Sequence, residues 1–304
     1  MPGSAVRDRR GSATVGAAPA ERLERRPRRR LKIPPVIWLS IGLLAVALIV
    51  ALLAPLLEPY RPTAQSLRAR LVPPVGFGGT LAHVLGTDHL GRDILARLIE
   101  SLRMTLFIAA LGTLIGALVG IALGLLAGTA GGFVDSFIMF LVDIQLAIPF
   151  TLAALTVIGI FGTSIAILIP VIGLAGWSQY ARLTRGQVLS VRQMLYVEAV
   201  QALGGSQRRL ALRHILPNVT SPIIVLVTYT FSQIMLLESS LSFLGLGVQP
   251  PQMSLGMMVG DGRNYLIGSW WIAVAPAAVL VAITVALALF GDWLRDRLDP
   301  RLER

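Results

Sequence analysis

Residues 196–217 read YVEAVQALGGSQRRLALRHILP, a polar stretch that lies between strongly apolar ones. From residue 181 to residue 217 the chain carries six arginines and a single acid, Glu198. An arginine at the centre of a bilayer costs at least about 2.5–3.5 kcal/mol on insertion scales, so these side chains must face water or protein. The stretch therefore predicts a long polar loop between two membrane-spanning helices.

Composition places the chain among membrane proteins. Of its 304 residues, 55% are hydrophobic and 14% are charged, and the mean hydropathy is +0.73. A soluble domain carries about 25% charged residues. Several apolar runs reach the ~20 residues that a helix needs to cross ~30 Å of hydrocarbon. We expect an all-α membrane protein with about six spans, at residues 36–57, 105–128, 137–160, 164–183, 220–241 and 271–290.

The distribution of charge indicates how the spans are oriented. Residues 1–35 hold nine arginines and Lys32 against three acids, and the loop at 181–217 is also basic. Because basic loops stay on the cytoplasmic side, we expect both termini and residues 184–217 in the cytoplasm. The segment at 58–104 is external in this scheme although it carries six arginines, and the rule weakens for long segments. Charge placed at the ends of spans also argues against nucleic acid as a partner.

The residue types that are missing exclude several chemistries. The chain has no cysteine, so disulfides and thiolate metal sites are excluded. A Walker A loop needs a lysine after its glycines, whereas Lys32, the one lysine, lies in an arginine run. Asp88, His89 and Asp93 make a weak candidate for an external metal site, and helix capping is the better interpretation. We expect no catalytic, cofactor or metal site in this chain.

The polar loop has an expected structure of its own. Residues 191–203 contain good helix formers and end at Gly204, a typical left-handed helix stop. Ser206 can cap a second short helix at 207–216 before the next span begins. A short helix that ends in glycine suits force transmission, because a packed helix moves as a body. From the residues alone, a coupling element and a plain helical hairpin are equally good interpretations.

The order of this loop, Glu198-Ala199, then Gly204, then Ile-Leu-Pro at 215–217, resembles the EAA loop of permease subunits in bacterial ATP-binding-cassette importers. The resemblance extends over residues 84–301 and is to the second-permease (C-type) subunit of dipeptide and oligopeptide importers. It rests on LGTDHLGRD at 85–93, GWSQYARLTRGQVL at 176–189, RHILPN at 213–218, LLESSLSFLGLGVQPP at 236–251, GRNYL at 262–266 and GDWLRDRLDPR at 291–301. The general pattern has alanine in place of Val200 and isoleucine in place of His214, and the second departure is familiar in the peptide branch.

This resemblance implies a type I importer permease fold in a subunit that is not itself an enzyme and needs no cofactor. It implies a homologous second permease subunit, two ATPase subunits that use the ATP, and an extracytoplasmic substrate-binding protein as partners. In a bacterial cytoplasmic (inner) membrane, the chain would form half of a pore for dipeptides or oligopeptides, with nickel, glutathione and other substrates still open. The residues it implies in ATPase coupling are Tyr196, Glu198, Ala199, Ala202, Leu203, Gly204, Arg208, Leu216 and Pro217.

With this resemblance the chain divides into five parts. They are a basic tail expected to be disordered and cytoplasmic (1–35), a retained anchor helix (36–57), an external segment with an amphipathic helix at 91–103 (58–103), a transmembrane permease domain (104–291) that includes the EAA loop (184–217), and a cytoplasmic tail (292–304). An ion-coupled secondary transporter is the alternative from another class, and a membrane-embedded enzyme is a weaker one. Uptake that persists with an inactivated ATPase partner favours the secondary transporter.

One expected span carries a glycine at every fourth residue. Small residues at this spacing let two helix backbones approach closely. We favour packing within the subunit over a contact with the partner permease. The stripe consists of Gly112, Gly116, Gly120, Gly124 and Gly128.

The expected span at 220–241 has one mildly polar face. Such a face can line a wet path or make interhelical hydrogen bonds, and because the resembling family uses this span beside its pore, we place the wet path slightly ahead. The candidate pore-lining residues are Ser221, Thr228, Ser232, Met235 and Ser239.

Asp143 and Glu238 are ionisable residues at or near membrane depth, where such groups are functional candidates by default. Neither lies at the midplane, where a proton-coupled transporter keeps its site. We therefore favour structural ion pairing for both. For Asp143 the expected partner is Arg182 or Arg185.

Overall fold

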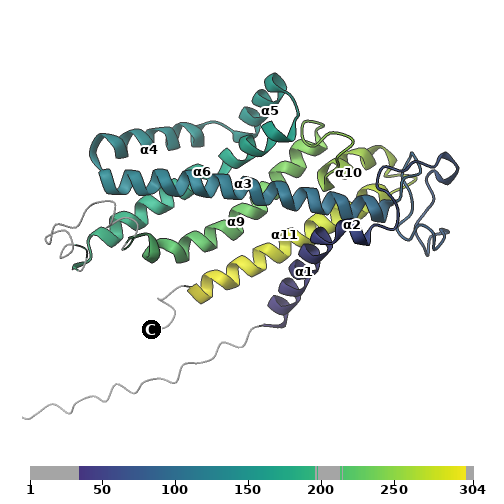
Figure 1. Ribbon diagram of the computed structural model, residues 1–304, viewed down its shortest axis with the longest axis horizontal. Helices are drawn as coiled ribbons and strands as arrows, with labels where there is room; N and C mark the ends of the chain where they lie inside the picture. The colour runs from purple at the N-terminus through teal and green to yellow at the C-terminus, as the bar shows by residue number, and fades with distance from the viewer. Residues whose placement is uncertain (1–33, 196, 198–212, 214, 299–304) are drawn as a thin grey trace, which may run out of the picture. The chain divides into compact units, whose positions relative to one another are not determined.

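The computed structural model describes residues 34–195, 197, 213 and 215–298, and the regular elements in those residues are helices (Figure 1). The α-helices are α1 (Pro35–Leu52), α2 (Ala54–Leu57), α3 (Ile94–Ala130), α4 (Gly132–Ala147), α5 (Phe150–Phe161), α6 (Ile165–Arg192), α9 (Leu216–Phe243), α10 (Leu255–Gly262) and α11 (Trp271–Leu298). Two short 3-10 turns are η1 (Leu67–Ala69) and η3 (Arg263–Tyr265). Five helices are long and apolar enough to cross a membrane, or six spans if the bent pair α4 and α5 counts as one. The protein is thus an all-α, multi-pass membrane protein.

Helix α3 differs from its expected form because it joins two elements that the sequence analysis kept apart. It has 37 residues, about 55 Å at 1.5 Å per residue, whereas the hydrocarbon core is ~30 Å thick. The amphipathic helix expected at 91–103 is therefore continuous with the span expected at 105–128. Asp93 caps the start of α3, because its side chain accepts a hydrogen bond from the Ala96 amide at 2.9 Å. Gly131, with φ 67°, ends it.

The span expected at 137–160 is broken rather than straight. Helices α4 and α5 meet at an angle of 87°. The break follows from Pro149, because a residue that precedes proline is disfavoured in helical conformation. Ile148 accordingly adopts φ −98° and ψ 128°. The result is a 16-residue helix along α3 and α6 followed by a 12-residue helix that runs at a steep angle to it and packs on α6 (Figure 1).

The glycine stripe of α3 packs against α6 of the same chain. A Cβ atom on Gly116 would lie 2.6 Å from the Gly173 carbonyl oxygen, and one on Gly124 would lie 2.5 Å from the Ala181 carbonyl oxygen. A Cβ on Gly128 would lie 2.7 Å from the Val188 side chain. Backbones this close leave no room for any side chain. The stripe therefore joins α3 to α6 along most of their common length.

Helix α9 lies at the centre of the remaining contacts, touching α3, α6, α10 and α11. Its fully buried residues Ile234, Met235 and Leu241 belong to the main apolar core together with residues of α3 and α6. Helix α1 packs on α11 and α3. Most of its large side chains, including Trp38 and Leu39, are exposed, as on a helix that faces lipid.

Candidate functional site

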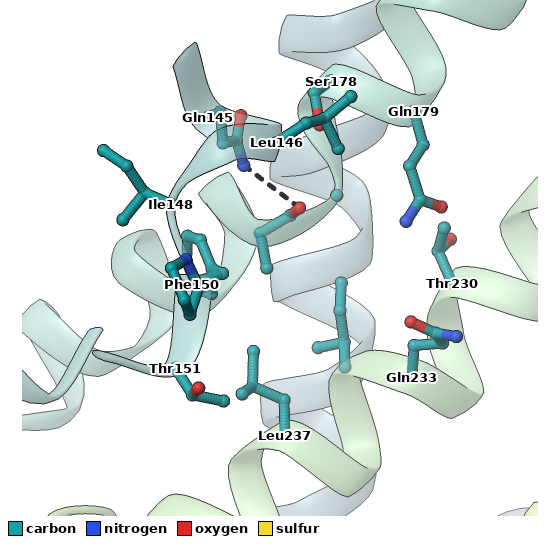
Figure 2. A pocket seen from close by; sticks show the side chains of 14 residues that line it. Gln145, Leu146, Ile148, Phe150, Thr151, Ser178, Gln179, Thr230, Gln233 and Leu237 are labelled. Carbon is teal, nitrogen blue, oxygen red and sulfur yellow. Dashed lines mark hydrogen bonds between the residues drawn. The ribbon is translucent and has the colours of Figure 1, made fainter. Parts of the chain in front are cut away.

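A recess opens where α4 breaks into α5, and α6 and α9 form its other walls. Its volume is about 410 Å³, within the range of small-molecule sites in proteins. Figure 2 shows the side chains around it. The lining residues are Gln145, Leu146, Ile148, Pro149, Phe150, Thr151, Ala175, Gly176, Ser178, Gln179, Thr230, Gln233, Ile234 and Leu237.

The lining of the recess combines apolar and neutral polar side chains and carries no ionisable one. Three carboxamides reach it from three helices: Gln145 from α4, Gln179 from α6 and Gln233 from α9. Gln179 and Gln233 extend towards Thr230 on one side of the recess, opposite the apolar side chains of Ile148 and Phe150 (Figure 2). Each carboxamide offers two donor hydrogens and an acceptor oxygen, so the recess can pair with neutral polar groups.

Local hydrogen bonds engage three of the polar residues in the recess, and one of these bonds is donated by Gln233 Nε2 to the Tyr229 hydroxyl at 2.5 Å. The Gln145 Nε2 atom donates to the carbonyl oxygens of Leu174 at 2.7 Å and Ala175 at 3.2 Å (Figure 2 marks the second bond). The Gln145 Oε1 atom is buried and has no partner among the residues that the structure describes. The Thr230 hydroxyl donates to the Leu226 carbonyl oxygen of α9 at 2.9 Å and accepts from the buried Tyr180 hydroxyl. Gln145 and Thr230 are therefore held in place, which leaves an acceptor on Gln145 unused.

The expected pore-lining face of α9 is instead its packed face. Met235 is 0% exposed and belongs to the core, while Ser232 and Ser239 are 8% and 5% exposed. Thr228 faces α11, where a Cβ atom on Gly291 would lie 2.8 Å from its Oγ1. The fifth residue of that face, Ser221, is half-buried. In this conformation the recess uses a neighbouring face of the helix, with Thr230, Gln233 and Leu237.

Sequence reasoning missed the recess because it searched for small hydroxyl side chains. A serine or threonine in a helix can bond its own backbone, as Ser232 does to the Thr228 carbonyl oxygen at 3.4 Å. Such a residue needs no water. The available signals for the recess were Pro149 and the glutamines in or beside apolar stretches.

A second polar site lies where α3 begins and α10 packs, here called the α10 end. Asp88 accepts hydrogen bonds from Arg92 Nε at 2.6 Å and Arg97 Nη1 at 2.5 Å, and Arg97 Nη2 lies 3.3 Å from Asp261. The side chains of Asp88 and Arg97 are 0% and 1% exposed. Burial alone would raise the pKa of Asp88, but the charge of Arg97 and the hydrogen bonds from Arg92 outweigh it and hold this pKa below its ordinary value of 3.8. The network joins the segment before α3 to α3 and α10.

The three residues weighed as a weak metal site are engaged elsewhere at the α10 end. Asp88 is bound by arginines, and Asp93 caps α3 and pairs with His83 at 2.9 Å. The ring of His89 stacks on Tyr265 at 5.2 Å between centroids. This geometry fits the capping interpretation.

Glu238 corrects an expectation, because the ion pair favoured for it is not found within the described part of the chain. Its side chain is fully buried, and Ser242 Oγ donates to Glu238 Oε1 at 2.6 Å. Ser239 Oγ lies 3.4 Å from Glu238 Oε2. The hydroxyls of Ser254, at the start of α10, and of Thr105, on α3, lie close to the carboxyl group as well. Neighbouring hydroxyls thus surround the carboxyl group where a cation was expected.

Two ion pairs join α4 to α6, a region here called the α4–α6 contact. Arg182 Nη2 lies 2.7 Å from Asp143 Oδ1, and both side chains are mostly exposed, at 55% and 68%. Arg185 binds Asp135 through two hydrogen bonds. Of the two partners expected for Asp143, the structure therefore selects Arg182.

The predicted coupling residues Tyr196, Glu198, Ala199, Ala202, Leu203, Gly204 and Arg208 lie outside the described residues. The other two, Leu216 and Pro217, form the start of α9, and proline is well tolerated in a first helical turn. A small apolar cluster at this place joins α6 to α9 and includes Val188, Val191, Val197 and Ile215. Both flanks of the predicted coupling loop are thus anchored on helices that line the recess.

Comparison with known proteins gives relatives along most of the chain. A dipeptide transport system permease protein, DppC, of Haemophilus influenzae is 37% identical over 265 residues, which cover 87% of this chain and 90% of that protein. A di/tripeptide transport system permease protein, DppC, of Pseudomonas aeruginosa is 40% identical over 86% of this chain and 88% of that protein. The dipeptide permease DppC of Escherichia coli K12 is 41% identical over 87% and 89%, respectively.

The fold has a counterpart of much lower sequence identity. A chain of the MetNI methionine ABC transporter in an inward-facing conformation superposes with a TM-score of 0.55 at 16% identity, covering 68% of this chain and 96% of that one. This likeness supports the importer permease fold. The family model described as "Binding-protein-dependent transport system inner membrane component" matches residues 120–304. On these matches the chain belongs to the family of binding-protein-dependent transport system inner membrane components, the permease components of ABC importers.

Proposed function

We propose that this chain is one of two permease subunits of an ATP-driven importer for dipeptides and other short peptides. The observation that carries the proposal is the match to peptide permeases across most of the chain, 86–87% of its length for the relatives named above. The uncharged recess between α4, α5, α6 and α9 gives such a subunit a place for a polar passenger. The chain works in a bacterial inner membrane, with residues 184–217 and both termini in the cytoplasm.

The partners follow from this role. A homologous second permease subunit supplies the other half of the pore, and an extracytoplasmic binding protein delivers the peptide at the α10 end. Two ATPase subunits bind below and use the ATP, so this chain holds no cofactor and catalyses no reaction.

The arrangement of α6 and α9 supports coupling through the predicted EAA loop. Helix α6 carries Gln179 of the recess and ends at Arg192, and α9 begins at Leu216 and carries Gln233. From Gln179 to the end of α6 is about 20 Å of continuous helix at 1.5 Å per residue. A displacement at the loop can therefore reach two walls of the recess through rigid helices.

Reconstitution with an inactivated ATPase partner tests the transport class. The chain is placed in proteoliposomes with its partner permease, binding protein and ATPases, and peptide uptake is measured with active and inactive motor subunits. Uptake should stop with the inactive motor. Uptake that continues at the wild-type rate, driven by an ion gradient, contradicts the proposal and favours a secondary transporter.

Substitutions in the predicted coupling loop test its role. Glu198→Ala and Gly204→Val should leave the subunit inserted and the complex assembled, yet lower peptide uptake relative to ATP hydrolysis. Gly204 is expected at a helix stop with positive φ, which a β-branched residue tolerates poorly. Gln201→Ala in the same segment is the control. Normal coupling in both test variants would show that the loop is an ordinary cytoplasmic hairpin.

Single cysteines test the orientation, because the native chain has none. Gln193→Cys, at the end of α6, should react with an impermeant thiol reagent only after the cytoplasmic side is opened. Labelling from outside intact cells would reverse the topology.

A further inference from the structure

We propose that the three carboxamides of the recess form a contact site for the peptide backbone of the passenger, and that this site does not read the charge of the peptide's side chains. The inference rests on the proposed function and assigns it a place. The residues concerned are Gln145 on α4, Gln179 on α6 and Gln233 on α9.

The chemistry of a carboxamide matches that of a peptide group. Both carry an N–H donor and a carbonyl acceptor, so each can satisfy the other in both directions. A polar group that leaves water without such a partner loses about 1–3 kcal/mol on the scale of protein mutations. The backbone is the part that all peptides share. A recess that pairs with it can lower this cost for any short peptide.

Gln145 is the best-defined member of the site. Its Nε2 atom is held by two backbone carbonyls of α6, and this contact fixes the plane of the carboxamide. Its Oε1 atom is buried without a hydrogen-bond partner among the described residues. A buried acceptor left unpaired is costly, and an N–H group that enters the recess is the kind of partner that this oxygen lacks.

The opposite wall supplies the remaining polar groups. In the view of Figure 2, Gln179 and Gln233 lie on either side of Thr230, and Gln233 Nε2 already donates to the Tyr229 hydroxyl at 2.5 Å, which leaves the Gln233 Oε1 atom as its acceptor. The apolar side chains of Ile148 and Phe150 face them across the recess. A peptide strand placed between these walls meets hydrogen-bonding groups on one side and an apolar surface for its side chains on the other.

The absence of charge from the lining makes the inference specific. The lining contains no carboxylate, imidazole or basic side chain. It therefore offers no strong ligand to a metal cation, which prefers such groups. It also attracts acidic and basic peptides equally. Neutral hydrogen bonds worth about 0.5–1.5 kcal/mol each keep the passenger weakly held, as transit requires.

The first experiment uses a cysteine reporter in the complete importer. Thr151→Cys places a thiol in the recess lining and leaves all three glutamines intact, while Thr156→Cys, exposed on the same helix but outside the lining, is the matched control. The rate of modification by a small aqueous thiol reagent is measured during ATP-driven turnover, with and without alanyl-alanine. The peptide should slow modification at residue 151 and leave residue 156 unchanged. Equal rates with and without peptide at both positions overturn the inference.

Two further outcomes distinguish a failure of the proposed site from a failure of the proposed function. If the thiol at residue 151 does not react even without peptide, the partner permease or lipid covers the recess, and the inference is overturned. If the wild-type complex imports no peptide although its motor is active, the proposed function fails. If import is normal but the peptide does not slow modification at residue 151, only the proposed contact site is contradicted.

The second experiment introduces the charge that the recess lacks. In the wild type, uptake of alanyl-lysine and alanyl-glutamate at saturating binding protein should differ little. Gln233→Glu should shift the uptake ratio towards the lysine peptide by up to about tenfold, the equivalent of about 1.4 kcal/mol. Gln233→Leu should lower uptake of both peptides without changing their ratio. A ratio that Gln233→Glu leaves unchanged contradicts a passenger contact at this position.

Discussion

The Arg97–Asp88 pair at the α10 end is buried, whereas the Arg182–Asp143 pair at the α4–α6 contact is largely exposed. Arg97 and Asp88 are 1% and 0% exposed, while Arg182 and Asp143 are 55% and 68% exposed. Both regions contain arginine–aspartate pairs of similar length. The same pair of residue types therefore serves as a fixed joint in one region and as a weak surface contact in the other.

This difference bears on the recess. Helix α4, which carries Gln145, buries only Ile138 and Val142 and meets α6 through one ion pair that is mostly exposed and one that is partly buried. The α10 end combines a buried charge network with the hydroxyl cluster around Glu238. We therefore expect the wall of the recess formed by α4 to move more easily than the frame formed by α3, α9 and α10. Four predictions test this contrast.

Arg97→Met should have the largest effect on stability. It removes the one arginine that contacts both Asp88 and Asp261 and leaves a buried carboxylate, a change that costs about 3–5 kcal/mol in buried pairs. Thermal unfolding of the purified subunit in detergent measures the loss. Arg103→Met on the same helix is the control, because Arg103 is half-exposed and lies 3.4 Å from Glu100. Equal destabilisation by both variants would end the claim that burial distinguishes the α10 end.

Glu238→Ala should come next, at about 1–3 kcal/mol, because several buried hydroxyls lose their common acceptor. Glu238→Gln keeps one carbonyl oxygen and should lose less. Ser240→Ala, at an exposed position two residues along the same helix, serves as the control. The measurement is again thermal unfolding of the purified subunit. If Glu238→Ala matches the control, the hydroxyl cluster does not hold α3, α9 and α10 together.

The α10 end also shows what the sequence could and could not predict. The class and most spans followed from apolar length and charge placement, whereas the family followed from the resemblance of the quoted motifs, and the family and fold are confirmed by the comparisons. The pairing of Asp88 with Arg97 did not follow, because the eight residues between them include a turn whose course the sequence does not specify. Glu238 was expected to need a cation, yet its carboxyl group is bonded by the hydroxyls of Ser242 and Ser239 instead, with hydroxyls from α3 and the start of α10 close by. Such a cluster depends on tertiary packing and has no local sequence signal.

The sequence analysis did not predict the recess, for two physical reasons. Pro149 indicates a helix break, but apolar length alone suggested one straight span. Small hydroxyl residues on α9 suggested a wet face, although they satisfy themselves on the helix backbone and pack inside the subunit. A glutamine side chain is too long to bond the backbone of its own helix easily. A glutamine within an apolar span is therefore the better indicator of a polar cavity.

Acid should weaken the α10 end through Asp88. Its pKa lies below 3.8 in the folded protein, so the folded state binds fewer protons than the unfolded state near that pH. The stabilisation is fully present above 3.8 and is lost as the pH falls through the lower folded value. Unfolding midpoints measured between pH 7 and pH 3 should therefore decline less steeply for Asp88→Asn, starting from a lower value at pH 7. Parallel curves for wild type and variant would rule out Asp88 as a source of the acid sensitivity.

Asp143→Asn should have the smallest effect, because an exposed ion pair contributes only about 0–1 kcal/mol and salt screens it further. Asp135→Asn should cost somewhat more, since Asp135 and Arg185 are 18% and 31% exposed and share two hydrogen bonds. Unfolding at low and high salt ranks the two variants, and both should fall well below Arg97→Met. If Asp143→Asn proves as damaging as Arg97→Met, α4 is fixed as firmly as the α10 end. The moving wall of the recess would then have to be sought in α5, which joins α4 only through the extended turn at Ile148 and Pro149.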